Sequence, residues 1–282
     1  MTTEVGMVEM KKRNRVECLS KITKNKRWKT MNNRHRVPPP PPAEAMVLQK
    51  LFESCKEVFK GPGTVPPPQD VQKLRKILDS MEPEDVGLSK DLFFKPKSVP
   101  EGTPSITCTT IYECKNFSLC IFFLPPTAVI PLHNHPGMTV FSKLLLGSMH
   151  IKAYDWADPG KSESSIPSLN VRLARLKANS VFTAPCNTSV LYPTSGGNIH
   201  AFTAVTTCAV LDVLGPPYSE EDGRDCTYYR DMPFSTGSSD GSAGEPKEGD
   251  GCYGWLEDIE MPKDLKMERV QYLGPQIIDT VC

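Results

Sequence analysis

Apolar side chains recur three and four positions apart in two stretches, near residues 48–59 and 71–78. This spacing places them on one face of a helix, so it predicts two amphipathic helices. A break rich in glycine and proline separates the stretches, and Asp70 can start the second helix. The first stripe consists of Leu48, Leu51, Phe52, Cys55, Val58 and Phe59, and the second of Val71, Leu74, Ile77 and Leu78. Core packing explains both stripes, and neither indicates a function.

From about residue 105 to residue 215 the pattern changes to that of strands. Each segment is short, rich in β-branched or aromatic residues, and bounded by Gly, Pro, Asn or Ser. Many short strands at regular spacing predict a sandwich or a barrel. The candidate strands are Ile106–Glu113, Phe117–Leu124, Met138–Leu146, Met149–Asp155, Asn170–Lys177, Ser180–Ala184, Ser189–Tyr192, Asn198–Val205 and Cys208–Leu214.

Three further segments flank or interrupt this strand-rich region. Residues 156–168 form a polar, hairpin-like connection, and the Gly/Ser/acidic residues 235–251 predict a mobile loop. After that loop, residues 252–278 carry Trp255, Leu256, Ile259 and Leu273, which we expect to dock on the barrel.

Residues 1–43 lack apolar periodicity and are dominated by Lys and Arg, with a run of proline at their end. Such a composition predicts a disordered basic tail followed by a polyproline II spacer. Two basic clusters, at residues 11–15 and 24–27, resemble a bipartite nuclear-import signal, although a solvated basic tail explains them equally well. We therefore expect a tail at 1–43, a folded domain at 44–282, and a location in nucleus and cytoplasm.

Composition limits the partners of the folded domain. Hydrophobic residues make up 39% of the chain, enough for a core, and the 27 prolines favour short strands with many turns. The formal net charge is zero, so we expect no direct contact with nucleic acid. The longest apolar stretch, Leu119–Ile130, is broken by two prolines, and the first ten residues lack the apolar region of a secretory signal. We therefore expect no membrane contact.

The ten cysteines are scattered and contain no CxxC pair. Several, including Cys120 and Cys208, lie in apolar strand-like runs, where a free thiol behaves as a small hydrophobic side chain. The pattern predicts free thiols in a reducing compartment rather than a disulfide framework.

Two of the five histidines, His133 and His135, stand at alternate positions. In an extended segment alternate side chains point to the same face, so both imidazoles can meet one ion. Neutral imidazole binds iron, zinc, copper and nickel alike. An isolated HxH pair can also be a turn with no ligand role.

A third histidine, His200, strengthens the metal interpretation. It opens an apolar strand far downstream, at a separation suited to a facing strand of the same barrel. Gly196 and Gly197 precede it and allow a sharp bend that aims the side chain inward. The sequence therefore predicts a metal site of His133, His135 and His200, whereas His150 lies on a polar face and is expected at the surface.

These motifs resemble those of the cupins, whose first motif is HxH, three residues, Glu, and whose second contains Gly-x-x-His. Here His133-x-His135 and Gly197-x-x-His200 match, but Thr139 stands at the position we assign to the glutamate. Threonine is a poor iron ligand, so the resemblance implies three neutral histidines. It also implies a mainly β fold: a cupin double-stranded β-helix, or jelly-roll barrel, with two N-terminal helices after the basic tail. Three-histidine iron cupins are characteristic of thiol dioxygenases.

Three longer segments, HNHPGMTVFSKLLLGSMHIKAYDW, YPTSGGNIHAFTAV and VLDVLGPPYSEEDGRDCTYY, resemble the cysteamine dioxygenase family, and within it the plant cysteine oxidases, over roughly residues 45–280. The resemblance implies one Fe(II) per chain, O2 as co-substrate, and oxidation of the N-terminal cysteine of proteins to sulfinic acid. The implied substrates are transcription factors beginning Met-Cys, which oxidation marks for the N-degron pathway in an oxygen-sensing response. The expected assembly is a monomer.

Two other functions stay open at this stage. The first is a dioxygenase of a free small thiol, either cysteamine or cysteine. The second is a non-catalytic cupin that binds a ligand, or nucleic acid through its basic tail, and the even overall charge argues against the latter.

Three further residues are candidates for the active site. Asp212 is a charge within an apolar strand, so it is either part of an ion pair or a group that orients a ligand or the substrate amine, and we adopt the second interpretation. Tyr218 either places a phenol over the mouth of the metal site or packs on a turn. Cys226 and Tyr228 match the place where cysteamine dioxygenases can form a thioether crosslink, and the sequence leaves open whether it forms.

Overall fold

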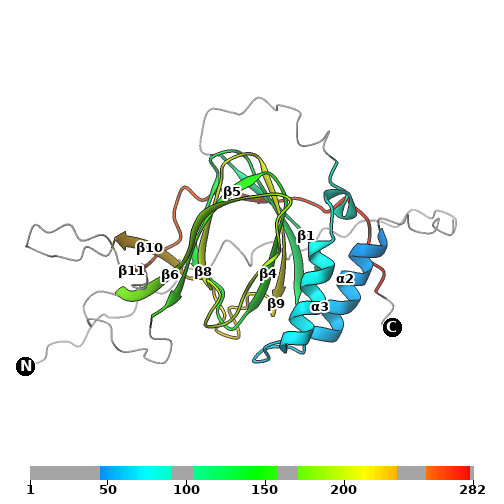
Figure 1. Ribbon diagram of the computed structural model, residues 1–282, viewed down its shortest axis with the longest axis horizontal. Coiled ribbons are helices and arrows are strands. Elements are labelled where there is room, and N and C mark those ends of the chain that lie inside the picture. Colours follow the sequence, from blue (N-terminus) through cyan, green and yellow to red (C-terminus); the bar gives the residue numbers. More distant parts are fainter. Residues whose placement is uncertain (1–44, 90–103, 158–170, 234–251, 280–282) are drawn as a thin grey trace, which may run out of the picture. The chain divides into compact units, whose positions relative to one another are not determined.

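The computed structural model of the protein describes residues 45–89, 104–157, 171–233 and 252–279 (Figure 1). The predicted tail at 1–43 and its boundary, the loop at 235–251 and most of the connection at 156–168 lie outside these ranges. The predictions for those segments therefore stay predictions.

Both predicted helices are present near the start of the described chain. Helix α2 spans Ala45–Val58 and helix α3 spans Pro68–Asp79, followed by the short 3-10 helix η1, Pro83–Val86. The second apolar stripe of the sequence is buried as expected, and proline occupies the first turn of α3, where its missing N–H costs no hydrogen bond. None of the described helices has the length and apolar character required to cross a bilayer.

The rest of the described chain is almost entirely strand. The strands are β1 Ile106–Glu113, β2 Ser118–Leu124, β3 Val129–Asn134, β4 Thr139–Leu146, β5 Ser148–Trp156, β6 Val171–Thr183, β7 Ser189–Leu191, β8 Ile199–Ala204, β9 Cys208–Gly215, β10 Tyr228–Pro233, β11 Tyr253–Ile259 and β12 Met267–Arg269.

The strands form two six-stranded sheets. The first sheet has the order β12-β1-β2-β9-β4-β7, and the second has the order β10-β11-β6-β5-β8-β3. The second sheet closes on itself, because β10 pairs with β3 through Tyr228 and His133. Apart from the β1–β12 pair, neighbouring strands are antiparallel. This architecture confirms the predicted mainly β cupin barrel with two N-terminal helices.

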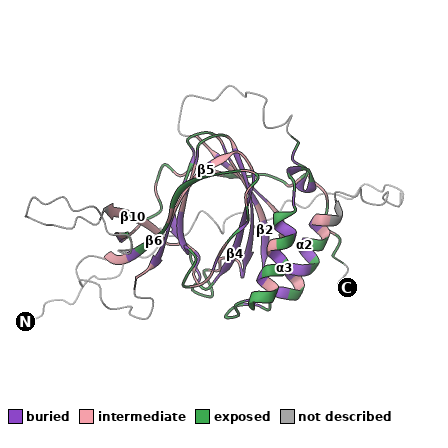
Figure 2. Ribbon diagram, viewed as in Figure 1, coloured by how far each residue is buried: buried purple, intermediate pink, exposed green. Residues whose placement is uncertain are grey.

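The helices cover the outer face of the first sheet. Phe52 of α2 and Phe59, directly after α2, both pack with Phe117, and Phe59 also contacts Phe141 of β4, all in one buried cluster. Figure 2 shows the buried residues of α2 and α3 on the sides that meet the sheet. A second buried cluster, which includes Ile130, Met149 and Phe202, fills the lumen between the sheets. The first sheet is thus apolar on both faces, as its continuous hydrophobic strands predict.

Strand β6 differs from the sequence prediction. The sequence predicted two strands, Asn170–Lys177 and Ser180–Ala184, whereas the structure has one continuous strand of 13 residues. An irregularity in its pairing with β5 lies near Ala178, where Ala153 and Tyr154 oppose Ala178 and Leu176. The bulge shifts the side-chain alternation within one strand, and this shift had the appearance of a strand boundary.

Four strands were missed as strands in the sequence: β3, β10, β11 and β12. Strand β3 contains Pro131 and was treated only as an extended ligand segment, while β12 has three residues. Strands β10 and β11 flank residues 234–251 and pair with each other. Their side chains lack a clear alternation of polar and apolar residues, so tertiary pairing rather than local pattern defines them.

Replacement of Phe52 by alanine tests the packing of the helices on the first sheet. Phe52 is 1% exposed and contacts the Tyr112 ring with centroids 4.6 Å apart. We expect Phe52→Ala to lower the free energy of unfolding by about 3–5 kcal/mol, measured by chemical denaturation. The control Glu53→Ala, at the exposed neighbouring position, should change it by about 0.5 kcal/mol or less. Equal effects of the two substitutions would show that α2 is not part of the core.

Candidate active site

The three predicted metal ligands converge in the lumen. His133 lies in β3, His200 lies in β8, and these two residues are Cα partners across the two strands. His135 follows directly after β3. The three imidazole ring centroids are each 4.9 Å from the other two, and the potential ligand atoms all lie within 4.8 Å of one another. One ion can therefore contact all three side chains.

Hydrogen bonds at the Nδ1 atoms orient the rings. Nδ1 of His133 lies 2.8 Å from the carbonyl oxygen of Pro131, to which it can only donate. Nδ1 of His135 lies 2.9 Å from the Tyr218 hydroxyl, which itself donates to the carbonyl of Asn134 at 2.8 Å. A proton on Nδ1 leaves the lone pair of Nε2 free for a metal.

The site is buried and its imidazoles are neutral at neutral pH. His133, His135 and His200 are 9%, 2% and 5% exposed. Burial lowers the pKa of all three, and for His135 the two neighbouring imidazoles lower the pKa further. The Nε2 atoms of His135 and His200 are 3.4 Å apart, a separation expected of two ligands about 2.1 Å from one ion. The donor set therefore fits a divalent transition metal.

A turn held by Asp155 positions His200. Gly196 and Gly197 have φ angles of 81° and 84°, in the left-handed region that glycine adopts without strain. The Asp155 carboxylate accepts hydrogen bonds from the backbone N–H groups of Gly196, Gly197 and Asn198 at 2.8–3.1 Å. A side chain at Gly197 would place its Cβ 2.8 Å from that of Ala153. The predicted glycine bend is thus present, and a carboxylate fixes it.

Asn198 links this turn to the other ligand segment. Its Oδ1 accepts from the N–H of His135 at 3.2 Å, and its Nδ2 donates to the His135 carbonyl at 2.9 Å. The same Nδ2 donates to the carbonyl of Tyr192 at 2.7 Å. One buried amide therefore fixes the backbone of His135 relative to the strand that carries His200.

The expected position of the missing glutamate needs a correction. Thr139 is buried, but its Cα partner is Gly215, whose Cα faces the Phe59 ring on the helix side of the sheet. Strand alternation therefore directs Thr139 away from the imidazoles. The neighbouring side chain that faces the lumen is Val140, which packs with Met138 and offers no ligand atom. The site still lacks a carboxylate at the motif position, because the residue that faces the lumen there is Val140 instead of Thr139.

Asp212 lies on the opposite wall of the lumen, in β9 of the first sheet. Its Cα partners are Cys120 and Ser142, and Ser142 lines the same cavity as His200. Its Oδ1 is buried without a hydrogen-bond partner among the described residues. Burial raises the pKa of its carboxyl group to about 7, and a hydrogen bond with Ser142 opposes the rise. Among the residues that the structure describes, no basic side chain forms an ion pair with Asp212, which favours a role toward a ligand over a structural ion pair.

Tyr218 lies beside the ligand His135, and Cys226 lies beside Tyr218. The Tyr218 hydroxyl contacts Nδ1 of His135, on the side of the ring that faces away from the metal position. The Cys226 thiol hydrogen-bonds with Tyr218 and Tyr228, and burial raises its pKa to about 11. The Tyr218 hydroxyl therefore orients a ligand, and the suggested place of its phenol over the mouth of the metal site stays a prediction. The proximity of Cys226 and Tyr228 agrees with the matched motif, and a thioether between them stays a prediction.

His150 does not take part in the cluster of imidazoles. It lies in β5 with Val181 and Thr203 as its Cα partners, on the face opposite to that of Met149, which lines the lumen. It is partly exposed, in agreement with its expected surface position.

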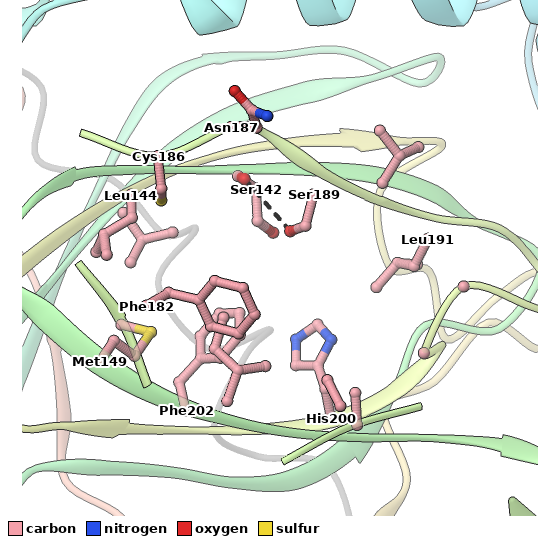
Figure 3. Close-up of a pocket in the computed structure, with 17 residues that line it drawn as sticks. Ser142, Leu144, Met149, Phe182, Cys186, Asn187, Ser189, Leu191, His200 and Phe202 are labelled. Carbon is pink, nitrogen blue, oxygen red and sulfur yellow. Dashed lines mark hydrogen bonds between the residues drawn. The ribbon is translucent and has the colours of Figure 1, made fainter. Parts of the chain in front are cut away.

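A cavity of about 120 Å³ extends from His200 along the lumen. Figure 3 shows Ser142 and Ser189 on one wall, facing His200 and Phe202 on the other. Phe202 stacks on the His200 imidazole, with ring centroids 4.4 Å apart and planes inclined by 11°. The cavity is therefore polar close to the imidazoles and apolar further along the barrel.

A buried lysine and the C-terminal end of α3 support the rim of this cavity. Lys143 is 3% exposed on the helix side of β4, and its Nζ donates to the carbonyl of Cys186 at 2.9 Å. Asp79, the last residue of α3, accepts from the N–H of Thr188 at 2.6 Å. Cys186 and Asn187 line the cavity. Lys143 and Asp79 thus hold the loop between β6 and β7 in place, although neither touches the lumen.

Sequence reasoning did not find Asp155, Asn198, Ser142 or Lys143. Asn198 stands inside the Gly-Gly-Asn-Ile-His motif, so its position next to a ligand was a usable signal. Lys143, a charge in an apolar strand, carried the same signal as Asp212. Asp155 and Ser142 carry no local signal, because their roles depend on loops and strands distant in sequence.

Comparison with known proteins identifies related sequences. The profile of the PCO_ADO family matches residues 77–277. Plant cysteine oxidase 2 of Arabidopsis thaliana is 53% identical over 82% of this chain and 83% of its own length, and plant cysteine oxidase 1 is 50% identical over 84% and 83%. The 2-aminoethanethiol dioxygenase of Mus musculus is 30% identical over 83% of this chain and 97% of its own length.

Solved structures give a weaker likeness. A conserved uncharacterised protein with a double-stranded β-helix domain from Klebsiella pneumoniae has a TM-score of 0.31 and 12% identity, over 50% of this chain and 94% of that one. An RmlC-like cupin protein from Desulfovibrio desulfuricans has a TM-score of 0.25 and 16% identity, over 44% of this chain and 98% of that one.

Removal of one imidazole tests the metal centre. We expect His200→Ala to reduce bound iron from about one ion per chain to a small fraction, because two neutral imidazoles hold a divalent ion weakly. Elemental analysis after loading with ferrous iron measures the change. The control His150→Ala, which removes a histidine outside the cluster, should retain full occupancy. Full occupancy in His200→Ala would mean that the ion binds elsewhere.

The raised pKa of Asp212 predicts a pH-dependent stability. The folded state holds this proton up to about pH 7, whereas the unfolded chain releases it near the ordinary carboxyl pKa of 3.8. Ionisation therefore favours unfolding as pH rises through this interval, by up to on the order of 4 kcal/mol. In the metal-free protein, Asp212→Asn should gain stability relative to the parent between about pH 4 and pH 7, as followed by denaturant unfolding. The control Asp264→Asn, at an exposed position, should show a difference that does not depend on pH. A pH-independent difference for Asp212→Asn would contradict the burial of an ionisable carboxyl.

Proposed function

This chain belongs to the PCO_ADO family of thiol dioxygenases, and we propose that it oxidises the N-terminal cysteine of proteins to cysteine sulfinic acid. The proposed substrates are transcription factors that begin Met-Cys and whose cysteine becomes the exposed N-terminal residue. After oxidation of this cysteine they enter the N-degron pathway. In this role the enzyme would report oxygen supply in nucleus and cytoplasm. The sequence identity of 50–53% with plant cysteine oxidases is the observation that favours an N-terminal cysteine of a protein as the substrate.

The proposed cofactor is Fe(II), held by His133, His135 and His200. Bound iron would supply the redox chemistry with O2 and a positive charge that favours the thiolate form of a cysteine. The overall reaction is balanced, since one thiol and one O2 give one sulfinic acid and no external reductant is consumed. Choice of iron over nickel or zinc rests on family membership, because imidazole binds all three.

The chain's own residues supply charge and position. Three neutral imidazoles leave the full charge of the ion, so a substrate thiolate is the anion that balances it. Asp212 faces the imidazoles from the other sheet with one carboxylate oxygen unpartnered among the described residues. We assign it to the α-ammonium group of the N-terminal cysteine. Such a contact would stabilise the ionised carboxylate and orient the sulfur toward the imidazoles.

Tyr218, Asn198 and Asp155 act on the ligands rather than on the substrate. Tyr218 fixes the tautomer of His135, Asn198 fixes its backbone, and Asp155 fixes the turn that precedes His200. Further along the lumen, Phe202 and its apolar neighbours keep water from the reacting centre. This arrangement holds two reactants on one centre, which supplies the proximity contribution to catalysis.

Oxidation of a free small thiol is the second candidate. The relationship to 2-aminoethanethiol dioxygenase, 30% identical, favours it. A barrel open on one side favours a larger substrate, because Phe182, which lines the cavity, is 38% exposed. A small thiol would need no such opening.

Mass spectrometry tests the reaction directly. A peptide with N-terminal cysteine, incubated aerobically with iron-loaded protein, should gain two oxygen atoms, and both should carry the label when the gas is oxygen-18. Turnover of cysteamine and of free cysteine under the same conditions serves as the comparison. A peptide of unchanged mass, alongside oxidised cysteamine, would assign the enzyme to small thiols. No oxidation of any thiol would remove the dioxygenase role.

A further inference from the structure

A row of small polar residues crosses the lumen face of the first sheet. Successive members are Cα partners on neighbouring strands, from β1 through β2, β9 and β4 to β7. Directly opposed residues of paired strands lie on the same face of a sheet. Two members line the cavity with His200, and Figure 3 shows them on the wall opposite this ligand, so the row faces the lumen. This polar row consists of Thr110, Cys120, Asp212, Ser142 and Ser189.

The polar row is narrow where it crosses β9 and β4. On one side of it, the neighbouring lumen positions are Val210 and Leu144, which are Cα partners. On the other side they are Leu214 and Val140, which are also Cα partners. All four side chains are buried. Aliphatic side chains offer no hydrogen bond, so within this sheet Asp212 finds side-chain donors only along its own row.

One hydroxyl of the polar row holds the Asp212 carboxyl group. The Ser142 side chain hydrogen-bonds with it, while its Oδ1 is buried without a hydrogen-bond partner among the described residues. On the other side lies the Cys120 thiol, 3.8 Å from Oγ1 of Thr110, and a thiol is only a weak donor. Burial raises the pKa of this thiol to about 11, so it is uncharged at neutral pH. Ser142 is therefore the neighbour that fixes one carboxylate oxygen and leaves the other for a ligand.

In the part of the chain that the structure describes, the lumen offers this carboxylate no positive charge. The three imidazoles opposite are neutral, because burial lowers their pKa. Lys143 follows Ser142 in β4, but it lies on the helix side, where its Nζ donates to the carbonyl of Cys186 at 2.9 Å. A buried carboxylate without a cation is costly, and an ammonium group that enters the cavity lowers this cost. The row therefore favours a ligand that carries an amine.

We propose that Ser142 is a positioning residue for Asp212: its hydroxyl holds one carboxylate oxygen, so that the other faces the α-ammonium group of the substrate. The enzyme thereby selects thiols that carry an amine. The inference rests on the proposed function and deepens it, because it names the residue on which recognition of the substrate's amine depends.

The hydroxyl acts on the carboxylate in two ways. It restricts rotation of the group, which keeps Oδ1 in one direction, and it stabilises the ionised form to which it donates. Only the ionised form balances an ammonium charge. Without the hydroxyl, a carboxyl group buried among apolar neighbours keeps its proton at neutral pH. The cavity would then bind thiols with and without an amine alike.

Removal of the hydroxyl tests this role in the iron-loaded protein. Two ligands are compared: a peptide with N-terminal cysteine, measured by its KM, and the same peptide with 3-mercaptopropionyl in place of cysteine, measured by its Ki as a competitor. They differ only in the α-amine. The parent should bind the amine-bearing peptide about tenfold or more tightly than the other, as expected for a hydrogen bond between charged groups. Ser142→Ala should remove most of this preference by raising KM, while Ki stays unchanged.

Two substitutions of similar shape provide a second test. Ser142→Thr keeps the hydroxyl and should keep the preference for the amine, whereas Ser142→Val replaces the hydroxyl by a methyl group and should lose it. The control Ser148→Ala removes a hydroxyl that is bonded to Thr183 at 2.8 Å, outside the residues that line the cavity, and should change neither constant. Equal behaviour of Ser142→Thr and Ser142→Val overturns the proposal, as does a rise of KM and Ki by the same factor in Ser142→Ala.

Failure of the inference is distinguishable from failure of the proposed function. An enzyme that oxidises the cysteine-initiated peptide, yet keeps its preference for the amine in Ser142→Ala and Ser142→Val, retains the proposed function and overturns the role of Ser142. An enzyme that oxidises cysteamine but no cysteine-initiated peptide overturns the proposed substrate. The same comparison, made with cysteamine and amine-free ethanethiol, then decides the role of Ser142.

Discussion

The structure depends on one constraint: three uncharged imidazoles must present their Nε2 atoms to a common point inside the barrel, where all three side chains are buried. Burial keeps the rings neutral, and a fixed partner at Nδ1 selects the tautomer that leaves Nε2 free. The surrounding polar contacts serve this arrangement. The Asp155 carboxylate holds the Gly196–Gly197 turn, and Asn198 joins that turn to His135. The Tyr218 hydroxyl donates to the carbonyl of Asn134, the residue before His135. Asp155 and Asn198 are buried and Tyr218 is half-buried, and each is satisfied by main chain or by a ligand, as a buried polar network requires.

The two sheets contribute opposite electrostatic properties to the lumen. The second sheet carries the neutral imidazoles, and the first sheet carries one carboxyl, Asp212, between Cys120 and Ser142. A carboxyl without a protein cation is costly to ionise, which is why its pKa rises to about 7. The outer face of the first sheet is fixed by α2 and α3, and the Lys143 and Asp79 contacts extend that support to the cavity rim. The helices, although far from the chemistry, thereby set the shape of the opening.

Strands β10 and β11 close the second sheet between β6 and β3. Lys152 of β5 pairs with Asp231 of β10, and the Tyr154 hydroxyl donates to the same carboxylate at 2.9 Å. These contacts hold β10 and β11 beside β5, and β10 places Tyr228 opposite His133 of β3. Strand β11 pairs with Val171–Arg175, the first part of β6.

The sequence by itself determined the features that are local. Helical stripes such as Val71 to Leu78, most strands between Ile106 and Leu214, and the alternate histidines 133 and 135 follow from periodicity, because neighbouring residues decide which face a side chain occupies. Specific motifs around His133 and His200 also pointed to the family. The tertiary structure alone decided which of Thr139 and Val140 faces the lumen, that β6 is a single bulged strand, and that Asp155 and Asn198 hold the ligands. Those outcomes depend on register and on contacts between residues far apart in sequence, for which the local pattern carries no information.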